Sequence, residues 1–291
     1  MPLYNLKKTK SKELSMLKSG LYIVATPIGN LEDITLRARK VLELADIIAC
    51  EDTRVAKKLL TLLGIKTDKK FVCYEDHREN AVAQEIVSMI EDNHAVALIS
   101  DAGCPLISDP GYRLVRLCRE KDIYLTVIPG ASAVISGLQM SGLPTNRFMF
   151  AGFIPNKVQG REKLFAELKN INTTLVFYET APRLPDTLKS MQKIFEKREI
   201  CVARELTKMY EECLNGQAAE LIERLEKNPV KGEIVIIVSP PLENEEAVDV
   251  EAELKKRLPL MSVKDAAKEV AALGGLKKNE VYETALRLKN E

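Results

Sequence analysis

The chain has 291 residues, 46% of them hydrophobic and 29% charged, which is typical of a folded protein of about two domains and excludes a largely disordered chain. The formal net charge is +1, so the chain as a whole carries no signature of nucleic-acid binding, and no apolar run approaches the roughly 18 residues that a membrane span requires. The N-terminal segment also lacks the apolar centre of a signal peptide, and we therefore expect a cytoplasmic protein.

Charge is concentrated at the two ends of the chain. Residues 1–20 contain five Lys and one Glu and are predicted to form a basic N-terminal tail. Residues 241–251 are predicted to be an acidic linker, and residues 252–291 a basic C-terminal unit. Basic ends are suited to contact with a phosphate backbone, although a solvated tail and a solvated helix face explain the same charges equally well.

From Leu21 onward, short apolar runs rich in Val and Ile alternate with segments whose apolar residues lie three and four apart. This alternation predicts strands and crossover helices around a parallel sheet. The predicted strands are residues 21–28, 45–50, 70–74, 95–100 and 123–128. Because these runs are apolar throughout, we expect strands that are buried on both faces. Residues 21–141 are therefore predicted to be an N-terminal α/β domain with a five-stranded, mainly parallel sheet.

A second series of strands follows, and it predicts a second α/β domain over residues 142–240. Its predicted strands are residues 148–154, 173–178, 198–205 and 233–239. The domain boundary is placed where Gly142 and Pro144 interrupt a helical pattern. Beyond the acidic linker, two helical segments separated by a Gly-Gly pair predict a small helix-turn-helix-like unit, whose first helix begins with a variant capping box at Ser262 and Asp265.

Several familiar signatures are absent from the sequence. No two glycines have G-x-G spacing, so the dinucleotide fingerprint is missing, and there is no phosphate-binding P-loop. There is likewise no G-x-S-x-G elbow. The six cysteines form no C-x-x-C pair and the chain has only two histidines, so we expect neither a metal centre nor disulfide bonds. The cysteines lie in or beside apolar runs, and we expect reduced, buried thiols.

Loops rich in Gly and Pro follow three of the predicted strands. They are TPIGN at residues 26–30, SDAGCPLISDPG at residues 100–111 and PGASA at residues 129–133. In an open α/β sheet, ligands bind beyond the carboxyl ends of the strands, so these loops are predicted to face one cavity. The alternative is that each loop is a plain turn, with Ser132 serving only as a helix N-cap.

Charged side chains follow other predicted strands. Residues 51–54 read EDTR, and further charges follow the second-domain strands. Those second-domain charges are Glu179, Arg183, Arg204, Glu205 and Lys208. Charges at strand ends favour a functional role, but ion pairing among themselves, and helix capping by Asp52 or Thr53, are the competing interpretations.

The motifs LYIVATPIGNLEDITLRA, EDTR, SDAGCPLISDPGYRLVR, PGASA, GFIP, FYET, ARELTK and KGEIVIIV occur in this order. Together they resemble the bacterial 16S ribosomal RNA cytidine 2'-O-methyltransferases of the tetrapyrrole methylase (class III methyltransferase) superfamily. The resemblance extends from about Gly20 to the C-terminus. Cys104 departs from the family pattern, which more often has Thr in this loop, and PGASA stands where PGP is common.

The resemblance implies two α/β domains with S-adenosylmethionine in the cleft between them, a homodimer, and 16S rRNA or the small ribosomal subunit as partner. The acceptor would be the ribose 2'-hydroxyl of a cytidine in the decoding centre. The cofactor-binding residues implied by analogy are Pro27, Gly29, Asp101, Ala102, Gly103, Ser132, Ala133, Tyr178, Leu206 and Glu233.

The predicted RNA-phosphate contacts are Arg54, Arg183, Arg204 and Lys208, with the N-terminal lysines, Lys277 and Lys278 as outlying contacts. A proton acceptor is needed for the acceptor hydroxyl, and the sequence does not choose one. The eligible side chains are Asp101, Glu51, Glu205 and Lys208.

Two alternative functions are kept. A small-molecule methylase of the same superfamily, acting on a tetrapyrrole, would share the cleft but have no use for basic ends. A non-catalytic RNA-binding protein would use the same charges and leave the cleft empty. Whether naked rRNA or an assembled subunit is the acceptor stays open.

Overall fold

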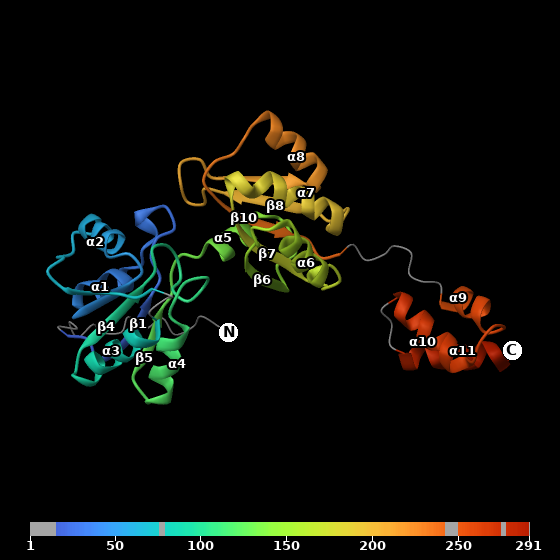
Figure 1. The fold of residues 1–291 in the computed structure, drawn as a ribbon, viewed down its shortest axis with the longest axis horizontal. Helices are drawn as coiled ribbons and strands as arrows, with labels where there is room; N and C mark the ends of the chain where they lie inside the picture. The colour runs from blue at the N-terminus through green and yellow to red at the C-terminus, as the bar shows by residue number, and fades with distance from the viewer. Residues whose placement is uncertain (1–15, 76–78, 242–249, 275–277, 291) are drawn as a thin grey trace, which may run out of the picture. The chain divides into compact units, whose positions relative to one another are not determined.

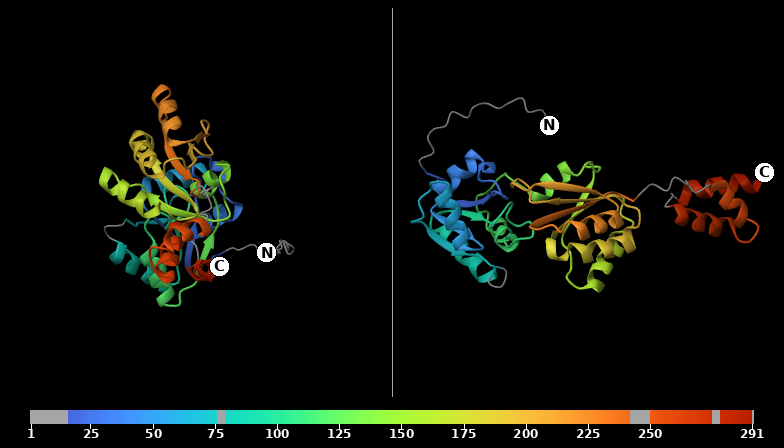
Figure 2. Two further views of the ribbon diagram at one scale, coloured as in Figure 1. Left: turned by 90° about the vertical axis from the view of Figure 1, so that its right-hand side faces the viewer. Right: turned by 90° about the horizontal axis from the view of Figure 1, so that it is seen from above.

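The computed structural model describes residues 16–75, 79–241, 250–274 and 278–290. The chain divides into two compact units, Met1–Pro241 and Leu242–Glu291, each of which is described by itself. The larger unit contains two α/β lobes, seen as the blue-to-green and yellow-to-orange segments in Figure 2. Within the described ranges, every helix is too short or too polar to cross a lipid bilayer.

The first lobe, residues 20–132, is built on a five-stranded sheet. Its strands are β1 Gly20–Val24, β2 Ile47–Cys50, β3 Lys70–Cys73, β4 Ala95–Ile99 and β5 Leu125–Ile128. Their order is β3-β2-β4-β1-β5 and every pairing is parallel. The helical elements are η1 Leu31–Asp33, α1 Leu36–Leu44, α2 Thr53–Leu62, α3 Glu79–Glu91 and α4 Tyr112–Glu120. The predicted parallel sheet is therefore confirmed.

Helices cover both faces of this sheet (Figure 1). The apolar sides of α1 and α2 pack on one face, around Leu42 and Leu60, and those of α3 and α4 pack on the other, around Ile86 and Leu114. All residues of β4 are buried, as expected for a central strand of a sheet with two covered faces. The loops that follow the strands are thus the part of the lobe left open to bind a ligand.

The second lobe, residues 148–238, contains a mixed sheet. Its strands are β6 Phe148–Phe153, β7 Thr174–Thr180, β8 Ile200–Arg204, β9 Glu212–Gly216 and β10 Glu233–Val238. The order is β6-β7-β10-β8-β9, in which only β6 and β7 pair in parallel. The helical elements are α6 Val158–Leu168, η3 Ala181–Arg183, α7 Leu184–Phe195 and α8 Ala218–Lys227. Strand β9 was not predicted, because ECLNG has too few apolar residues to show as a buried strand.

Helix α5 Ala133–Met140 joins the two lobes. The sequence assigns it to the first domain, but its apolar residues Val134 and Leu138 pack against the second sheet, beside Val235 and Ile237 of β10. Helices α6, α7 and α8 cover the opposite face of that sheet. The second sheet therefore buries one face on a helix that directly follows a predicted ligand loop, PGASA.

The described residues of the C-terminal unit form three helices, α9 Val250–Arg257, α10 Val263–Gly274 and α11 Lys278–Asn290. They share an apolar cluster that includes Leu254, Val270 and Val281. Helix α9 was not predicted, since its charged sequence shows little helical period. The expected capping at Ser262 is present: Asp265 N–H donates to Ser262 Oγ at 3.2 Å, and the hydroxyl donates to Asp265 at 2.5 Å.

Some sequence-based predictions fall outside the described residues. These are most of the basic tail, at residues 1–15, the greater part of the acidic linker, at residues 242–249, and Lys277. The end of the predicted tail belongs to the fold, because Ser19 Oγ donates to Ile90 O at 2.7 Å and Gly20 begins β1. The domain boundaries drawn from the sequence otherwise stay predictions.

Candidate functional site

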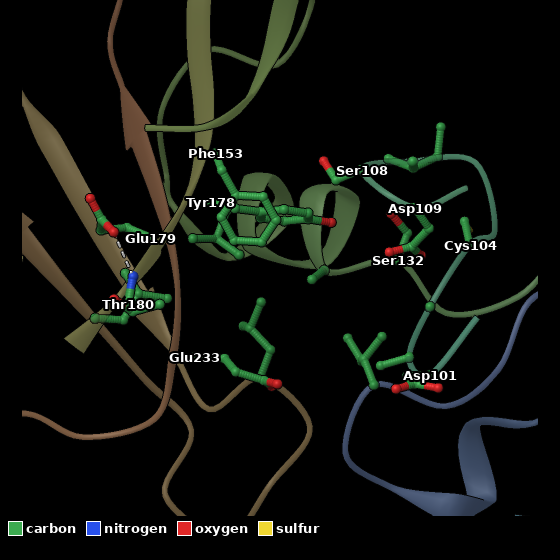
Figure 3. Close-up of a pocket in the computed structure, with 18 residues that line it drawn as sticks. Asp101, Cys104, Ser108, Asp109, Ser132, Phe153, Tyr178, Glu179, Thr180 and Glu233 are labelled. Carbon is green, nitrogen blue, oxygen red and sulfur yellow. Dashed lines mark hydrogen bonds between the residues drawn. The ribbon is translucent and has the colours of Figure 1, made fainter. Parts of the chain in front are cut away.

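A cavity of about 360 Å³ lies between the two lobes, and we call it the cleft. It lies at the carboxyl ends of β1 and β4, where the parallel sheet was expected to bind a ligand. Figure 3 shows its lining, with Asp101 and Ser132 on one side and Tyr178 and Glu233 on the other. A volume of this size is within the roughly 300–1,000 Å³ typical of small-molecule sites.

The three Gly/Pro loops meet beside the cleft through backbone contacts. Thr26 and Gly103 exchange two hydrogen bonds, with N–H to O distances of 2.8 and 3.2 Å, which tie the first loop to the second. Cys104 Sγ donates to Ala131 O at 3.4 Å and ties the second loop to the third. Gly103 has φ +82°, a conformation that favours glycine, and its bare backbone forms part of the cavity wall.

Eight of the ten residues expected to hold the cofactor line this cavity. From the first lobe and the start of α5 come Asp101, Ala102, Gly103, Ser132 and Ala133, and from the second lobe Tyr178, Leu206 and Glu233. Pro27 and Gly29 are not part of the lining, although Ile28 between them is. Ser132 also caps α5, its Oγ accepting from Ile135 N–H at 3.5 Å, so the capping interpretation and the cavity placement hold together. The roles of these residues stay predictions.

Gly29 makes a close packing contact beside the cleft. A Cβ atom on Gly29 would lie 2.4 Å from Lys208 Cγ, 2.9 Å from Thr207 Oγ1 and 3.0 Å from Leu206 O. The loop after β1 therefore meets the loop after β8 at a distance that only glycine permits. This close approach holds the two lobes together at one end of the cleft, next to the lining residue Leu206.

The loop after β8 is conformationally strained. Glu205 and Thr207 have φ of +49° and +65°, which is uncommon for residues with side chains. Thr207 Oγ1 is buried and has no hydrogen-bond partner among the described residues. Burying an unpaired hydroxyl costs free energy, so this loop is held in a costly arrangement against Gly29.

Ionic contacts fix the same loop. Lys208 Nζ donates to Glu205 at 3.1 Å and to Glu233 at 2.8 Å. Burial disfavours the charged form of Glu205, but hydrogen bonds from Lys208 and from Glu233 N–H outweigh it and hold the pKa of that carboxyl below its ordinary value. For Lys208, burial is similarly outweighed by its two carboxylate partners, and its pKa is raised. A lysine held in its charged form is poorly suited to accept a proton.

The first-lobe side of the cleft has a different electrostatic character. Burial raises the pKa of Asp101, and the negative charge of Asp52 raises it further. The hydrogen bond that Asp101 accepts from Asp52 N–H lowers the pKa but does not cancel this increase. On the opposite wall, burial raises the pKa of Tyr178 to about 12. Tyr178 is therefore neutral near pH 7, while the raised pKa makes Asp101 a better proton acceptor than an exposed aspartate.

All four basic residues predicted to bind RNA phosphates lie against carboxylates. The pairs are Arg54–Asp52 at 2.6 Å, Arg183–Glu179 at 3.2 Å, Arg204–Glu212 at 2.7 Å and Lys208–Glu205 at 3.1 Å. Ion pairing, the competing interpretation, is thus present at each of them, and Asp52 caps α2 by accepting from Arg54 N–H. Arg54 is the most accessible, with 90% of its side chain exposed. Their contacts with RNA stay predictions.

The sequence did not single out several residues of the cleft as ligand contacts. They are Ile28, Cys104, Ile107, Ser108, Asp109, Phe153, Glu179, Thr180, Ile234 and Val235. Four of them lie in the same loop as Asp101, in which Leu106 and Ser108 have positive φ. The length of this Gly/Pro loop was the feature of the sequence from which these four contacts could have been predicted. Phe153, Ile234 and Val235 gave no such signal, because apolar strand residues look the same whether they face a core or a cavity.

Cys104 occupies the position where the resembling family more often has Thr. Its Sγ donates to Ala131 O, a bond that a hydroxyl could also make, and burial raises the pKa of the thiol. The six cysteines differ in exposure: Cys50, Cys118 and Cys201 are buried, whereas Cys73 is exposed. The expectation that all six are buried is therefore wrong for Cys73, which ends β3 beside the loops.

The fold and the cleft define a methyltransferase of the tetrapyrrole methylase class. The family model for tetrapyrrole (corrin/porphyrin) methylases matches residues 20–222. A solved uroporphyrin-III C-methyltransferase from Thermus thermophilus, in complex with S-adenosylhomocysteine, superposes with a TM-score of 0.53 at 16% identity, covering 76% of this chain and 97% of that one. At this identity the likeness concerns the fold.

Sequence relatives define the family more narrowly. A ribosomal RNA small subunit methyltransferase I from Rickettsia prowazekii is 53% identical over 77% of this chain and 79% of its own length. Another, from Erythrobacter litoralis, is 50% identical over 94% of this chain and 96% of its own. The model of the RsmI C-terminal HTH domain matches residues 244–289. The chain belongs to the ribosomal RNA small subunit methyltransferase I family, as its motifs indicated.

Proposed function

We propose that this protein uses S-adenosylmethionine to methylate the ribose 2'-hydroxyl of a cytidine in the decoding centre of 16S rRNA. The observation that carries the proposal is the cleft, which combines three ligand loops of the first lobe with a wall from the second. The family relatives at 50% identity and above support the RNA substrate.

The residues of the cleft fit the cofactor. Apolar side chains of Ile28, Leu206 and Val235 offer a surface for an adenine ring, and the exposed backbone at Gly103 offers hydrogen bonds at close range. The carboxylates of Asp101 and Glu233 face the cavity from opposite lobes (Figure 3) and suit hydroxyl or ammonium groups. Bound there, the cofactor supplies an electrophilic methyl group on a sulfonium centre.

The protein then has to position an acceptor oxygen and remove its proton. Positioning alone contributes a large part of the rate in such transfers, about 7–11 kcal/mol at best. An unstacked nucleotide from a loop is the expected form of the acceptor, because A-form helices hide base edges in a deep groove. We also propose that the enzyme works in the cytoplasm, with 16S rRNA or the small ribosomal subunit as its partner.

A homodimer is part of this proposal. Strand β6 lies at the edge of its sheet, and its side chains Phe148 and Met149 are 42% and 37% exposed. An edge strand that exposes large apolar side chains is a typical protein contact surface.

The direct test is cofactor binding followed by transfer. Calorimetric titration with S-adenosylmethionine should give a micromolar Kd. Incubation with methyl-labelled cofactor and unmethylated small ribosomal subunits should place label in 16S rRNA, recovered after nuclease digestion as 2'-O-methylcytidine. Absence of any binding heat favours the non-catalytic alternative, and label that appears only in added precorrins favours the tetrapyrrole methylase.

Gly29→Ala should weaken cofactor binding, although Gly29 itself does not line the cleft. The new methyl group collides with Lys208 Cγ and the backbone oxygen of Leu206, so the loop after β8 has to move and takes the lining residue Leu206 with it. We expect the Kd to rise by about tenfold, equivalent to about 1.4 kcal/mol.

The matched control for this variant is Gly64→Ala. Gly64 has φ +71°, and no atom lies within 4 Å of the position that the new methyl group would occupy, so the substitution strains the backbone without a collision at the cleft. Its cofactor Kd should match that of the unmodified protein. Equal Kd values for both variants and the unmodified protein would show that the Gly29 contact does not shape the cleft.

A further inference from the structure

A second cavity, of about 580 Å³, adjoins the cleft on the first-lobe side, and we call it the side cavity. It lies between the end of β2, the start of α2 and the end of β3. Its lining residues are Glu51, Asp52, Thr53, Arg54, Cys73, Glu75 and Asp101. Asp101 lines the cleft as well, so one carboxylate forms part of both walls. In Figure 3 it lies on the side of the cleft nearest the blue ribbon of the first lobe.

The lining of the side cavity carries four carboxylates and one guanidinium. Such an interior repels phosphate and accepts hydrogen bonds from amines and hydroxyls. Arg54 differs from the others because 90% of its side chain is exposed, so its charge is available to solvent rather than to the interior. Arg54 holds Asp52 through its Nε and Nη2 atoms, and the exposed remainder of its guanidinium can still be approached by a phosphate from solvent. A ligand with donor groups at its centre and a phosphate at its edge matches this distribution of charge.

We propose that the side cavity receives the acceptor nucleoside, with its ribose hydroxyl directed past Asp101 toward the cofactor. This inference rests on the proposed function and adds to it the place of the acceptor and the identity of the proton acceptor. A nucleoside has the required groups: ribose hydroxyls, an exocyclic amine on cytosine, and a phosphate that can reach Arg54. Carboxylates are common partners of the cytosine amine.

Asp101 is held in a position to serve both cavities. Its Oδ1 accepts a hydrogen bond from Asp52 N–H at 3.4 Å, which links the loop after β4 to the start of α2. In the transfer, the acceptor oxygen forms a bond to the methyl carbon while the carbon–sulfur bond breaks and its electron pair stays on sulfur. The hydroxyl proton passes to the Asp101 carboxylate and then to water, so the step needs no further reactant.

Glu75 has a replaceable partner inside the side cavity. The thiol of Cys73 lies within donor distance of its Oε1, at 2.9 Å, and of Glu51 O, at 3.1 Å, so the two oxygens share one thiol hydrogen. A thiol is a weak donor, so an amine of the base forms a stronger bond with the same oxygen. The contact therefore holds the carboxylate in place before the acceptor arrives and yields to it afterwards. Cys73, being exposed, also reports on occupancy of the cavity.

The first experiment measures alkylation of Cys73 by N-ethylmaleimide, quantified by peptide mass spectrometry. Small ribosomal subunits added with S-adenosylhomocysteine should slow the reaction at Cys73 by about tenfold or more, the effect of a subsite that is at least nine-tenths occupied. S-adenosylhomocysteine alone should leave the rate within about twofold, since it occupies the cleft. An unchanged rate in the presence of subunits overturns the proposed subsite.

The second experiment fills the side cavity with Cys73→Phe. Cofactor affinity should be retained, and kcat/KM for small subunits should fall by about 100-fold or more, because a displacement of reacting groups by about 1 Å already has that effect. Lys70→Phe is the matched control: it adds the same ring to the exposed end of β3 outside both cavities and should keep full activity.

The two proposals fail in different ways. If the unmodified protein binds the cofactor and methylates subunits, but Cys73→Phe is as active as Lys70→Phe, the acceptor lies elsewhere and only the subsite is rejected. If the unmodified protein transfers no methyl group to small-subunit RNA, the proposed function itself is rejected, and the subsite with it.

Discussion

Asp101→Asn should lower the rate of methyl transfer by about 10² to 10⁴-fold, the usual contribution of a positioned proton acceptor. The amide keeps the size of the carboxyl and can still accept the hydrogen bond from Asp52 N–H, so the loop should stay in place. Cofactor Kd, measured by calorimetry, should change by no more than about tenfold, the effect of one hydrogen bond. Asp92→Asn, an exposed aspartate at the end of α3, is the control.

The pH dependence of the reaction distinguishes a proton acceptor from a residue that only binds. Burial raises the pKa of Asp101 above the usual aspartate value, and only the ionised form accepts a proton. Activity should therefore be full above that raised pKa and fall as the pH drops through it. The residual activity of Asp101→Asn should no longer show this fall at low pH. A variant that keeps the fall, or transfers methyl groups at the normal rate, contradicts the assignment.

Glu179→Ala should destabilise the second lobe by about 3–5 kcal/mol, the effect of breaking a buried ion pair. The Glu179 side chain is fully buried, accepts from Thr187 Oγ1 at 2.6 Å and from Thr180 N–H at 2.8 Å, and lies 3.2 Å from Arg183 Nε. Removing it leaves the Thr187 hydroxyl without its acceptor, and leaves the Arg183 guanidinium, which still donates to Ile154 O, without its negative partner. Because Glu179 belongs to the strand that forms one wall of the cleft, cofactor affinity should fall as that wall is destabilised.

Urea unfolding followed by circular dichroism measures this loss. Glu179→Gln should fall between the two proteins, since the amide oxygen still accepts a hydrogen bond but no longer balances the charge of Arg183. Glu226→Ala, an exposed glutamate on α8, should stay within about 0.5 kcal/mol of the unmodified protein. A loss below about 1 kcal/mol for Glu179→Ala would mean that the pair is solvated in solution.

The strands were predictable because their signal is local. Nine of the ten strands that the structure describes overlap predicted apolar runs by most or all of their length. The exception is β9, which pairs with β8 at the edge of the sheet. An edge strand has no neighbouring strand on its outer side, and one of its two faces can be left uncovered, so its sequence need not be apolar. Helix α9 was missed for a similar reason: it buries only Leu254 along its length, too little to leave a helical period.

The lining of the cleft was predictable only in part. Gly and Pro loops at strand ends are visible in a sequence, and those after β1, β4 and β5 do meet. Val235 is different, because its apolar side chain lines the cleft and also packs on α5, and nothing in the sequence separates these surroundings from an ordinary core. Gly29 packs on the loop after β8, a contact that no local pattern indicated, and its role at the cofactor stays a prediction.

Local patterns were sufficient to predict the two α/β lobes, the strand-end loops and the family, because each is written in short segments of the chain. Only the folded protein shows which charges meet, as between Lys208 and Glu233, and that Asp101 lines two cavities at once. Those contacts join segments that are far apart in sequence. Their geometry depends on how loops pack across the two sheets, which local pattern does not encode.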